Sequence, residues 1–363
     1  MINIPNEEEV IDVNEQEESI APVIYDISSY GADYDVEGLV KRLKRGDIFI
    51  PPFQRDYVWN QAEASRLIES LLLGLPVPGV FLAKDNESSK LSVIDGQQRL
   101  KSLLFFYEGF FNPKEDDTRK NIFRLKNVQP QFEGRTYDDL EEDDRINLDD
   151  SIIHSTIIKQ ESPNNDNTSI YHVFERLNTG GRKLTAQEIR SAIYIGELNN
   201  LIIELNEYES WRTLFGKKNN RLKDQEMILR FFSFYRYLNN YTKPLKEFLN
   251  KFNNKYRNPS NEDLKEFSDI FMKTTDLILE IFGTAAFRPD RVFNTATYEV
   301  LMVGIATKIQ NKIDVNYTLM ASNINDLYSN PDFIDSITRA TSDEKIVQKR
   351  HQLFTDFVEK YVQ

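Results

Sequence analysis

The stretch LSVIDGQQRLKSLLFFY, residues 91–107, places a short apolar run, a turn and an amphipathic run in immediate succession. The apolar residues 91–94 predict a buried strand, and the Asp-Gly pair that follows them is a turn signal. After this turn, Leu100, Leu103 and Tyr107 recur at the spacing of one helix face. The stretch therefore predicts a strand, a tight turn and a helix.

The residues at the start of this predicted helix have the chemistry of an anion site. Gln97, Gln98 and Arg99 fall in the first helical turn, where backbone N–H groups are free and the helix dipole is positive. An arginine beside such N–H groups can bind phosphate, and Gly96 allows a close approach of the backbone to a ligand. An ordinary helix start, with Asp95 as its N-cap and two surface amides, explains the same residues equally well.

Composition excludes several classes of protein. The chain has 363 residues, enough for about two domains, and no cysteine, which excludes disulfides, thiolate chemistry and cysteine-ligated metals. No apolar run approaches the roughly 18 residues that a membrane span needs. The N-terminus is acidic and lacks a signal-peptide pattern, so a cytoplasmic protein is expected. A histidine-rich metal site is not expected, because the three histidines are scattered as His154, His172 and His351.

Charge is distributed unevenly along the chain. The net charge is −13, yet residues 211–257 hold twelve basic and three acidic residues. Such a segment is a candidate for contact with DNA; the residues selected are Lys217, Lys218, Arg221 and Lys223. Basic and aromatic residues also interleave over residues 243–256, a pattern that fits either a nucleic-acid surface or a lysine-rich face over a phenylalanine core.

Along the whole chain, the pattern predicts an α+β region followed by a mostly α-helical region. Predicted strands cover residues 47–50, 80–83, 91–94, 120–128 and 151–158, and predicted helices cover residues 34–46, the segment after the Asn60 cap, residues 169–177 and the segment from residue 97. From residue 188 onward the periodicity is helical almost throughout, and Thr185 with Glu188 forms a capping box before it. We predict an acidic flexible leader over residues 1–30, an α+β domain over residues 31–190 and a helical bundle over residues 191–363.

Three separated blocks carry a resemblance to a known family. They are IPPFQRDYVWN at residues 50–60, VIDGQQRLKSL at residues 93–103 and FERLNTGGRKLTAQEIR at residues 174–190. Together they resemble the N-terminal domain of GmrSD-type modification-dependent restriction enzymes, which belongs to the ParB/sulfiredoxin-like superfamily. The resemblance implies that residues 31–190 form a small domain with a mixed sheet. Many relatives carry a C-terminal HNH nuclease domain, whose clustered histidines this sequence lacks, so the chain resembles a stand-alone member.

The resemblance implies a nucleotide-binding, NTP-hydrolysing protein that recognises DNA, which in this family is modified, within a bacterial restriction or anti-phage defence system. It implies catalytic roles for Asp95, Gln97, Gln98 and Arg99. Nucleotide-binding roles are implied for Gln54, Arg55, Gly96, Asn178, Thr179, Gly180, Gly181 and Arg182. Asp95 would also hold Mg²⁺, and cleavage would need a partner nuclease subunit or a different active site.

Two other functions fit the same residues. One is a ParB-like metal-dependent DNA nuclease that uses Asp56 and Asp95, the two carboxylates of the first two blocks. The other is a non-catalytic module that binds DNA or a partner protein through the basic helices. A P-loop is excluded, because no GxxxxGK[ST] motif is present. The nucleotide, the DNA modification and any homo-oligomeric state are left open.

Overall fold

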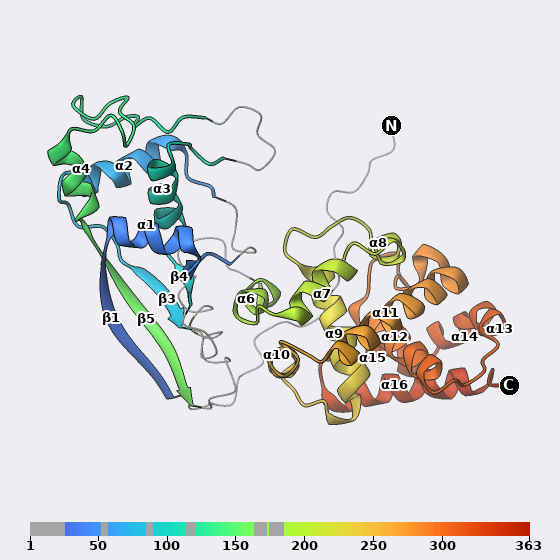
Figure 1. The fold of residues 1–363 in the computed structure, drawn as a ribbon. Coiled ribbons are helices and arrows are strands. Elements are labelled where there is room, and N and C mark those ends of the chain that lie inside the picture. The colour runs from blue at the N-terminus through green and yellow to red at the C-terminus, as the bar shows by residue number, and fades with distance from the viewer. Residues whose placement is uncertain (1–25, 52–56, 85–89, 114–120, 163–172, 174–184) are drawn as a thin grey trace, which may run out of the picture. The chain divides into compact units, whose positions relative to one another are not determined.

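The computed structural model describes residues 26–51, 57–84, 90–113, 121–162, 173 and 185–363 (Figure 1). These residues divide into two compact units, and each is described by itself. The first unit comprises the described residues between 26 and 173 together with residues 191–193; the second comprises residues 185–190 and 194–363. The predicted domain boundary at residue 190 falls inside helix α6. No helix in the described ranges combines the length and apolar character needed to span a bilayer.

A mixed five-stranded sheet organises the first unit. Its strands are β1 (Asp26–Asp35), β2 (Ile48–Phe49), β3 (Val80–Lys84), β4 (Leu91–Asp95) and β5 (Ile152–Ser162). The strand order is β1-β5-β3-β4-β2, with β1–β5 and β3–β4 antiparallel and β5–β3 and β4–β2 parallel. The predicted α+β class, with a mixed sheet followed by a mostly helical region, is confirmed.

Four helices lie together beside this sheet (Figure 1). They are α1 (Val36–Arg45), α2 (Gln61–Leu72), α3 (Gln97–Glu108) and α4 (Glu142–Asp149). As predicted, Asn60 is the N-cap of α2, and its side chain forms a capping box with Glu63. The apolar faces of the helices and one face of the sheet share a core that includes Leu82, Val93 and Leu103. This packing fixes the start of α3 against the ends of β3 and β4.

Two expectations for this unit were wrong in their secondary structure. Residues 121–128 form no strand; Phe123 and Leu125 are fully buried anchors of a loop whose backbone bonds run to Gly109 and Arg135. Strand β1 begins at Asp26, inside the predicted leader. Its sequence, DISSYGADYD, has little apolar alternation of its own, because it is an edge strand held by its pairing with β5.

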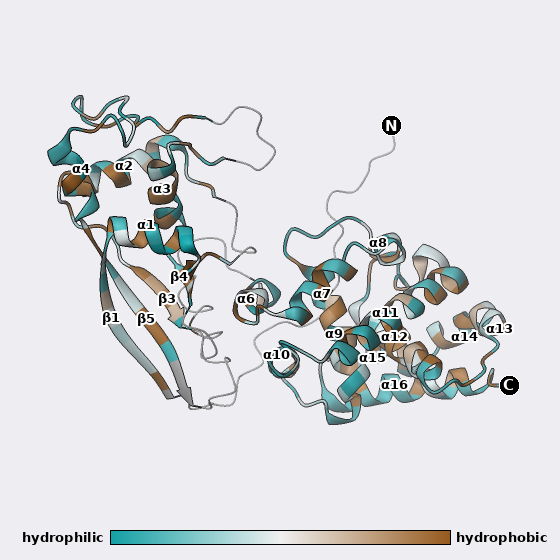
Figure 2. Cartoon of the chain, viewed as in Figure 1, coloured by the Kyte–Doolittle hydropathy of each residue, from teal (hydrophilic) through white to brown (hydrophobic). Residues whose placement is uncertain are grey.

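The second unit is a bundle of helices. They are the first part of α6 (Ala186–Ile193), whose residues 191–193 group with the first unit, and then α7 (Glu197–Leu205), α8 (Glu209–Phe215), α9 (Lys223–Tyr237), α10 (Leu245–Lys255), α11 (Asn261–Phe282), α12 (Thr295–Gln310), α13 (Tyr317–Ser322), α14 (Ile324–Tyr328), α15 (Pro331–Thr338) and α16 (Glu344–Glu359). Hydrophilic and hydrophobic residues alternate along α16 (Figure 2), as an amphipathic surface helix requires. Helix α12, in contrast, is buried along most of its length, which makes it the centre of this unit.

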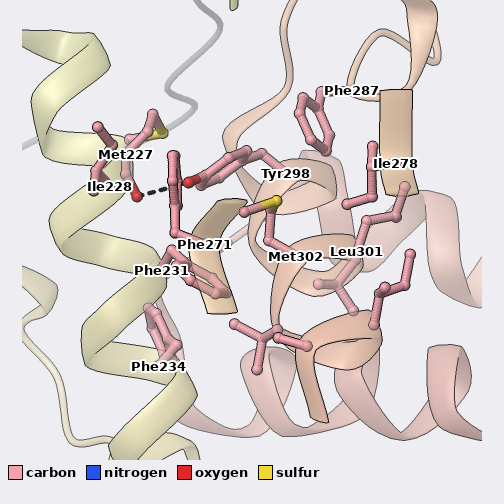
Figure 3. Packing of buried hydrophobic residues seen from close by; sticks show 14 of the residues in the cluster. Met227, Ile228, Phe231, Phe234, Phe271, Ile278, Phe287, Tyr298, Leu301 and Met302 are labelled. Carbon is pink, nitrogen blue, oxygen red and sulfur yellow. Dashed lines mark hydrogen bonds between the residues drawn. The ribbon is translucent and has the colours of Figure 1, made fainter. Parts of the chain in front are cut away.

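The bundle core is rich in aromatic side chains. Phe231 of α9 packs against Phe271 of α11, and the buried Tyr298 hydroxyl of α12 donates to the Met227 carbonyl at 3.0 Å (Figure 3). Because an unpaired hydroxyl would be costly in such a core, this bond satisfies the one polar atom that Tyr298 brings into it. The apolar face predicted for residues 224–237 is the face that packs here.

A buried cluster of charged side chains joins three helices of the bundle. Glu299 of α12 is fully buried and accepts from Arg230 Nε of α9 at 2.7 Å and from Arg350 Nε of α16 at 3.1 Å, with a second, shorter bond from Arg350 Nη2. His351 Nε2 lies 3.3 Å from Glu299 Oε1. Burial alone would raise the pKa of Glu299, but Arg350, Arg230 and His351 outweigh it and hold the pKa well below its ordinary range.

Candidate functional site

The start of helix α3 is built on a glycine rather than on a capping side chain. Gly96 is the N-cap residue, with φ of 104°, and makes no side-chain cap bond. A Cβ atom at this position would lie 2.4 Å from Val80 Cγ1, so both the backbone conformation and the packing against β3 require glycine. Asp95 is therefore not the N-cap. Gln97 and Gln98 are 7% and 6% exposed, so they are not surface amides either, and the ordinary helix start considered above is wrong.

Arg99 ties the ends of strands β3 and β4 to the first turn of α3. Its Nη2 donates to the Gly79 carbonyl at 2.8 Å and to Asp95 Oδ2 at 2.9 Å. The Arg99 side chain is 17% exposed, and its buried Nε has no hydrogen-bond partner among the described residues. The guanidinium is thus fixed in position by two hydrogen bonds.

Gly79 is a site residue that the sequence reasoning missed. Its carbonyl holds Arg99, and a Cβ atom at Gly79 would lie 2.6 Å from the His154 carbonyl oxygen of β5. Any side chain here would push β3 away from β5. The sequence signal was available in the run LPVPGV just before the strand, where glycine follows proline.

Gln98 binds backbone rather than facing an open site. Its Oε1 accepts from the N–H groups of Val58 at 2.9 Å and Trp59 at 3.1 Å. One turn further along α3, Ser102 Oγ lies 2.7 Å from the Tyr57 hydroxyl. Residues 57–59, which end the first sequence block, are therefore held directly against α3.

Several predicted site residues lie outside the described residues. They are Gln54, Arg55 and Asp56 of the first block and Asn178, Thr179, Gly180, Gly181 and Arg182 of the third, together with nearly all of the helix predicted over residues 169–177. Their roles stay predictions, as does the nuclease alternative that uses Asp56. The described end of the third block does bear out one expectation: Thr185 and Glu188 form the capping box of α6, with bonds of 3.1 and 2.5 Å.

Most of the basic residues selected for DNA contact have acidic partners. Lys218 pairs with Glu207 at 2.6 Å, Arg221 with Glu188 at 3.2 Å, and Lys223 with Glu226 at 2.8 Å, whereas Lys217 is exposed. The basic excess of this segment is thus largely used within the second unit, because Arg230 and Arg236 also bind carboxylates. A phosphate backbone would have to compete with these pairs.

No group of three metal-ligating side chains occurs within the ranges that the structure describes. Asp95 is the carboxylate nearest the start of α3, and it is 47% exposed while paired with Arg99. A single carboxylate suits Mg²⁺ only if phosphate oxygens and water supply the remaining ligands. Asp95 thus fits a Mg²⁺ ion whose other ligands are phosphate oxygens and water.

The fold and the site define a class of protein: a small mixed-sheet domain with an arginine-bearing helix start, continued by a helical bundle. Residues 36–195 match the family model for the N-terminal domain of the GmrSD restriction endonuclease. The chain therefore carries a domain of this family, as the three sequence blocks indicated. A comparison with curated proteins gave no match.

Proposed function

We propose that this chain is a nucleotide-binding component of a bacterial restriction or anti-phage defence system, with the nucleotide phosphates bound at the start of α3. The family match supports the restriction or defence setting. The observation that carries the nucleotide assignment is Arg99, whose guanidinium is fixed by Gly79 and Asp95 at the start of α3 while the side chain stays 17% exposed. A guanidinium held in this way is preorganised for a phosphate oxygen.

The position of Arg99 at the start of α3 adds to this argument. Gly96 brings no side chain to this end of the helix, and the positive end of the helix dipole favours a bound anion. Hydrolysis of an NTP would then depend on the positioning of the phosphates and on electrostatic stabilisation of their charge. Arg99 would neutralise phosphate charge, and Gln97 lies beside it in the first turn of α3. Mg²⁺ would neutralise further phosphate charge, and among the residues that the structure describes Asp95 would be its protein ligand.

The DNA and partner assignments rest on the family alone. We propose that the chain acts on DNA, which in the family's restriction enzymes is modified, together with a nuclease subunit. If Lys217 and Lys218 contact the DNA backbone, replacing both with glutamate should weaken DNA binding. The slope of the logarithm of the binding constant against the logarithm of salt concentration should then fall by an amount equivalent to about two phosphate contacts. The measurement is a salt titration of binding to duplex DNA, and an unchanged slope would exclude this pair.

The nucleotide site can be tested by thermal shift with each NTP in the presence and absence of Mg²⁺. A ligand that binds only the folded state at 100 times its Kd stabilises it by about 2.7 kcal/mol. Arg99→Ala should reduce this stabilisation to about 1.4 kcal/mol or less, since a lost charge-assisted bond weakens binding by about tenfold or more. The matched control is Arg124→Ala, because Arg124 also binds a carbonyl and a carboxylate, those of Gly134 and Asp139, but is half exposed. Equal nucleotide shifts in the wild type and Arg99→Ala would overturn the assignment.

A further inference from the structure

The place of Gln98 in the DGQQR motif suggests a catalytic role, but its contacts indicate that it holds the backbone of a neighbouring segment. Its side chain is 6% exposed, and one atom, Oε1, faces two backbone N–H groups. Because both partners are donors, the amide orientation is fixed with the oxygen toward them. A carboxamide oxygen has two lone pairs, and both are used by Val58 and Trp59. Oε1 therefore has no remaining capacity to orient a water molecule or to accept from a ligand.

A second contact holds the same segment on the same helix. Ser102 Oγ donates to the Gln98 carbonyl at 2.7 Å, so its hydrogen is used, and the Tyr57 hydroxyl must be the donor in the Tyr57–Ser102 bond. Burial raises the pKa of Tyr57 to about 12, which keeps the phenol protonated as this bond requires. The Tyr57 ring also packs edge-on against Phe105 at 5.0 Å.

We propose that Gln98 is a positioning residue that clamps residues 57–59 to α3. The clamp itself rests on the observed contacts; its effect on nucleotide affinity rests on the proposed function. In sequence, one residue separates the clamped segment from Gln54 and Arg55, which are predicted to bind nucleotide. Gln98 thus acts on a ligand through the segment that it holds.

Three single variants separate a clamp from a direct ligand contact. Gln98→Met keeps the length of the side chain but removes the acceptor. Val58→Pro removes one of the two N–H donors without changing α3. Val58→Ala keeps that N–H, and because the Val58 side chain is 59% exposed it serves as the matched control.

Amide hydrogen exchange measures the clamp directly, with no ligand present. The Val58 and Trp59 amides should exchange about tenfold faster in Gln98→Met than in the wild type or Val58→Ala, because their acceptor is gone. Unchanged exchange in a Gln98→Met protein with wild-type circular dichroism would overturn the clamp. This outcome is independent of nucleotide binding, so an absence of binding in the wild type would count against the proposed function alone.

Nucleotide affinity then tests the positioning role. Gln98→Met and Val58→Pro should each weaken binding of the NTP identified by thermal shift by about tenfold, and Val58→Ala should not. The double variant should be no weaker than the weaker single variant, because both changes remove the same interaction. If Gln98→Met loses affinity while Val58→Pro binds as the wild type does, Gln98 contacts the ligand itself and the positioning role is wrong.

Discussion

Replacing Glu299 with glutamine is a sharp test of how the helical unit is held together. The two side chains have nearly the same volume, so the change leaves no cavity. It removes one negative charge from a fully buried position that faces Arg230 and Arg350. The glutamine oxygen can still accept a hydrogen bond, but its NH₂ group would point a donor at a guanidinium that has only donors.

The expected loss of stability is large because two buried cations lose their counter-charge. Removing one partner of a buried ion pair typically costs about 3–5 kcal/mol. The surface pair formed by Glu207 and Lys218 is 54% and 62% exposed, so Glu207→Gln should cost about 1 kcal/mol or less. The two substitutions make the same chemical change within one unit and differ mainly in burial.

Urea unfolding followed by tryptophan fluorescence measures this difference. The chain has two tryptophans; a Trp59→Phe background leaves Trp211, which is fully buried in the helical unit, as the only reporter. With an m-value of about 2 kcal/mol/M, Glu299→Gln should lower the midpoint by about 2 M and Glu207→Gln by about 0.5 M or less. Similar midpoints for the two variants would refute the view that Glu299 balances the buried arginines.

Two further changes test other parts of the structure. Gly96→Ala combines a positive φ with a clash against Val80 and should destabilise the sheet unit by about 2–4 kcal/mol. Gly109 also has a positive φ, but a Cβ atom there meets open space, so Gly109→Ala should cost about 1 kcal/mol. Equal losses of stability in thermal unfolding would contradict the clash. Burial lowers the pKa of His351 below its ordinary value of 6.5, so the unfolded chain binds the proton more readily and stability should fall as the pH drops below about 6.5. His351→Gln should flatten this fall between pH 7 and 5 in urea titrations, and an unchanged slope would contradict it.

Segments with strong periodicity were predictable from sequence because their own pattern specifies them. The apolar face of residues 224–237 became α9 nearly to the residue, and the Asn60 and Thr185 caps start the helices expected of them. Strand β1 was not predictable in this way, since its partner β5 lies more than a hundred residues further along the chain.

The candidate site was predictable in its residue types but not in its contacts. The DGQQR motif identified Arg99, yet the carbonyl that holds Arg99 comes from Gly79, a residue that local sequence patterns do not connect to it. The carboxylates that neutralise Lys218 and Arg221 could not be identified from local sequence either, because Glu207 lies in the turn after α7 and Glu188 lies in α6. Side-chain chemistry can be read locally, whereas the partner of a charge is set by tertiary structure.

The cluster around Glu299 also has a consequence for biosynthesis. Its members are spread from Arg230 through Glu299 to His351, so a nascent chain presents the first arginine and its carboxylate well before the last pair has left the ribosome. During that interval the emerging bundle would hold a half-neutralised carboxylate among exposed aromatic rings, a species prone to aggregation. Translation speed between residues 299 and 351, or a chaperone that shields α9 and α12, should therefore govern the yield of native protein.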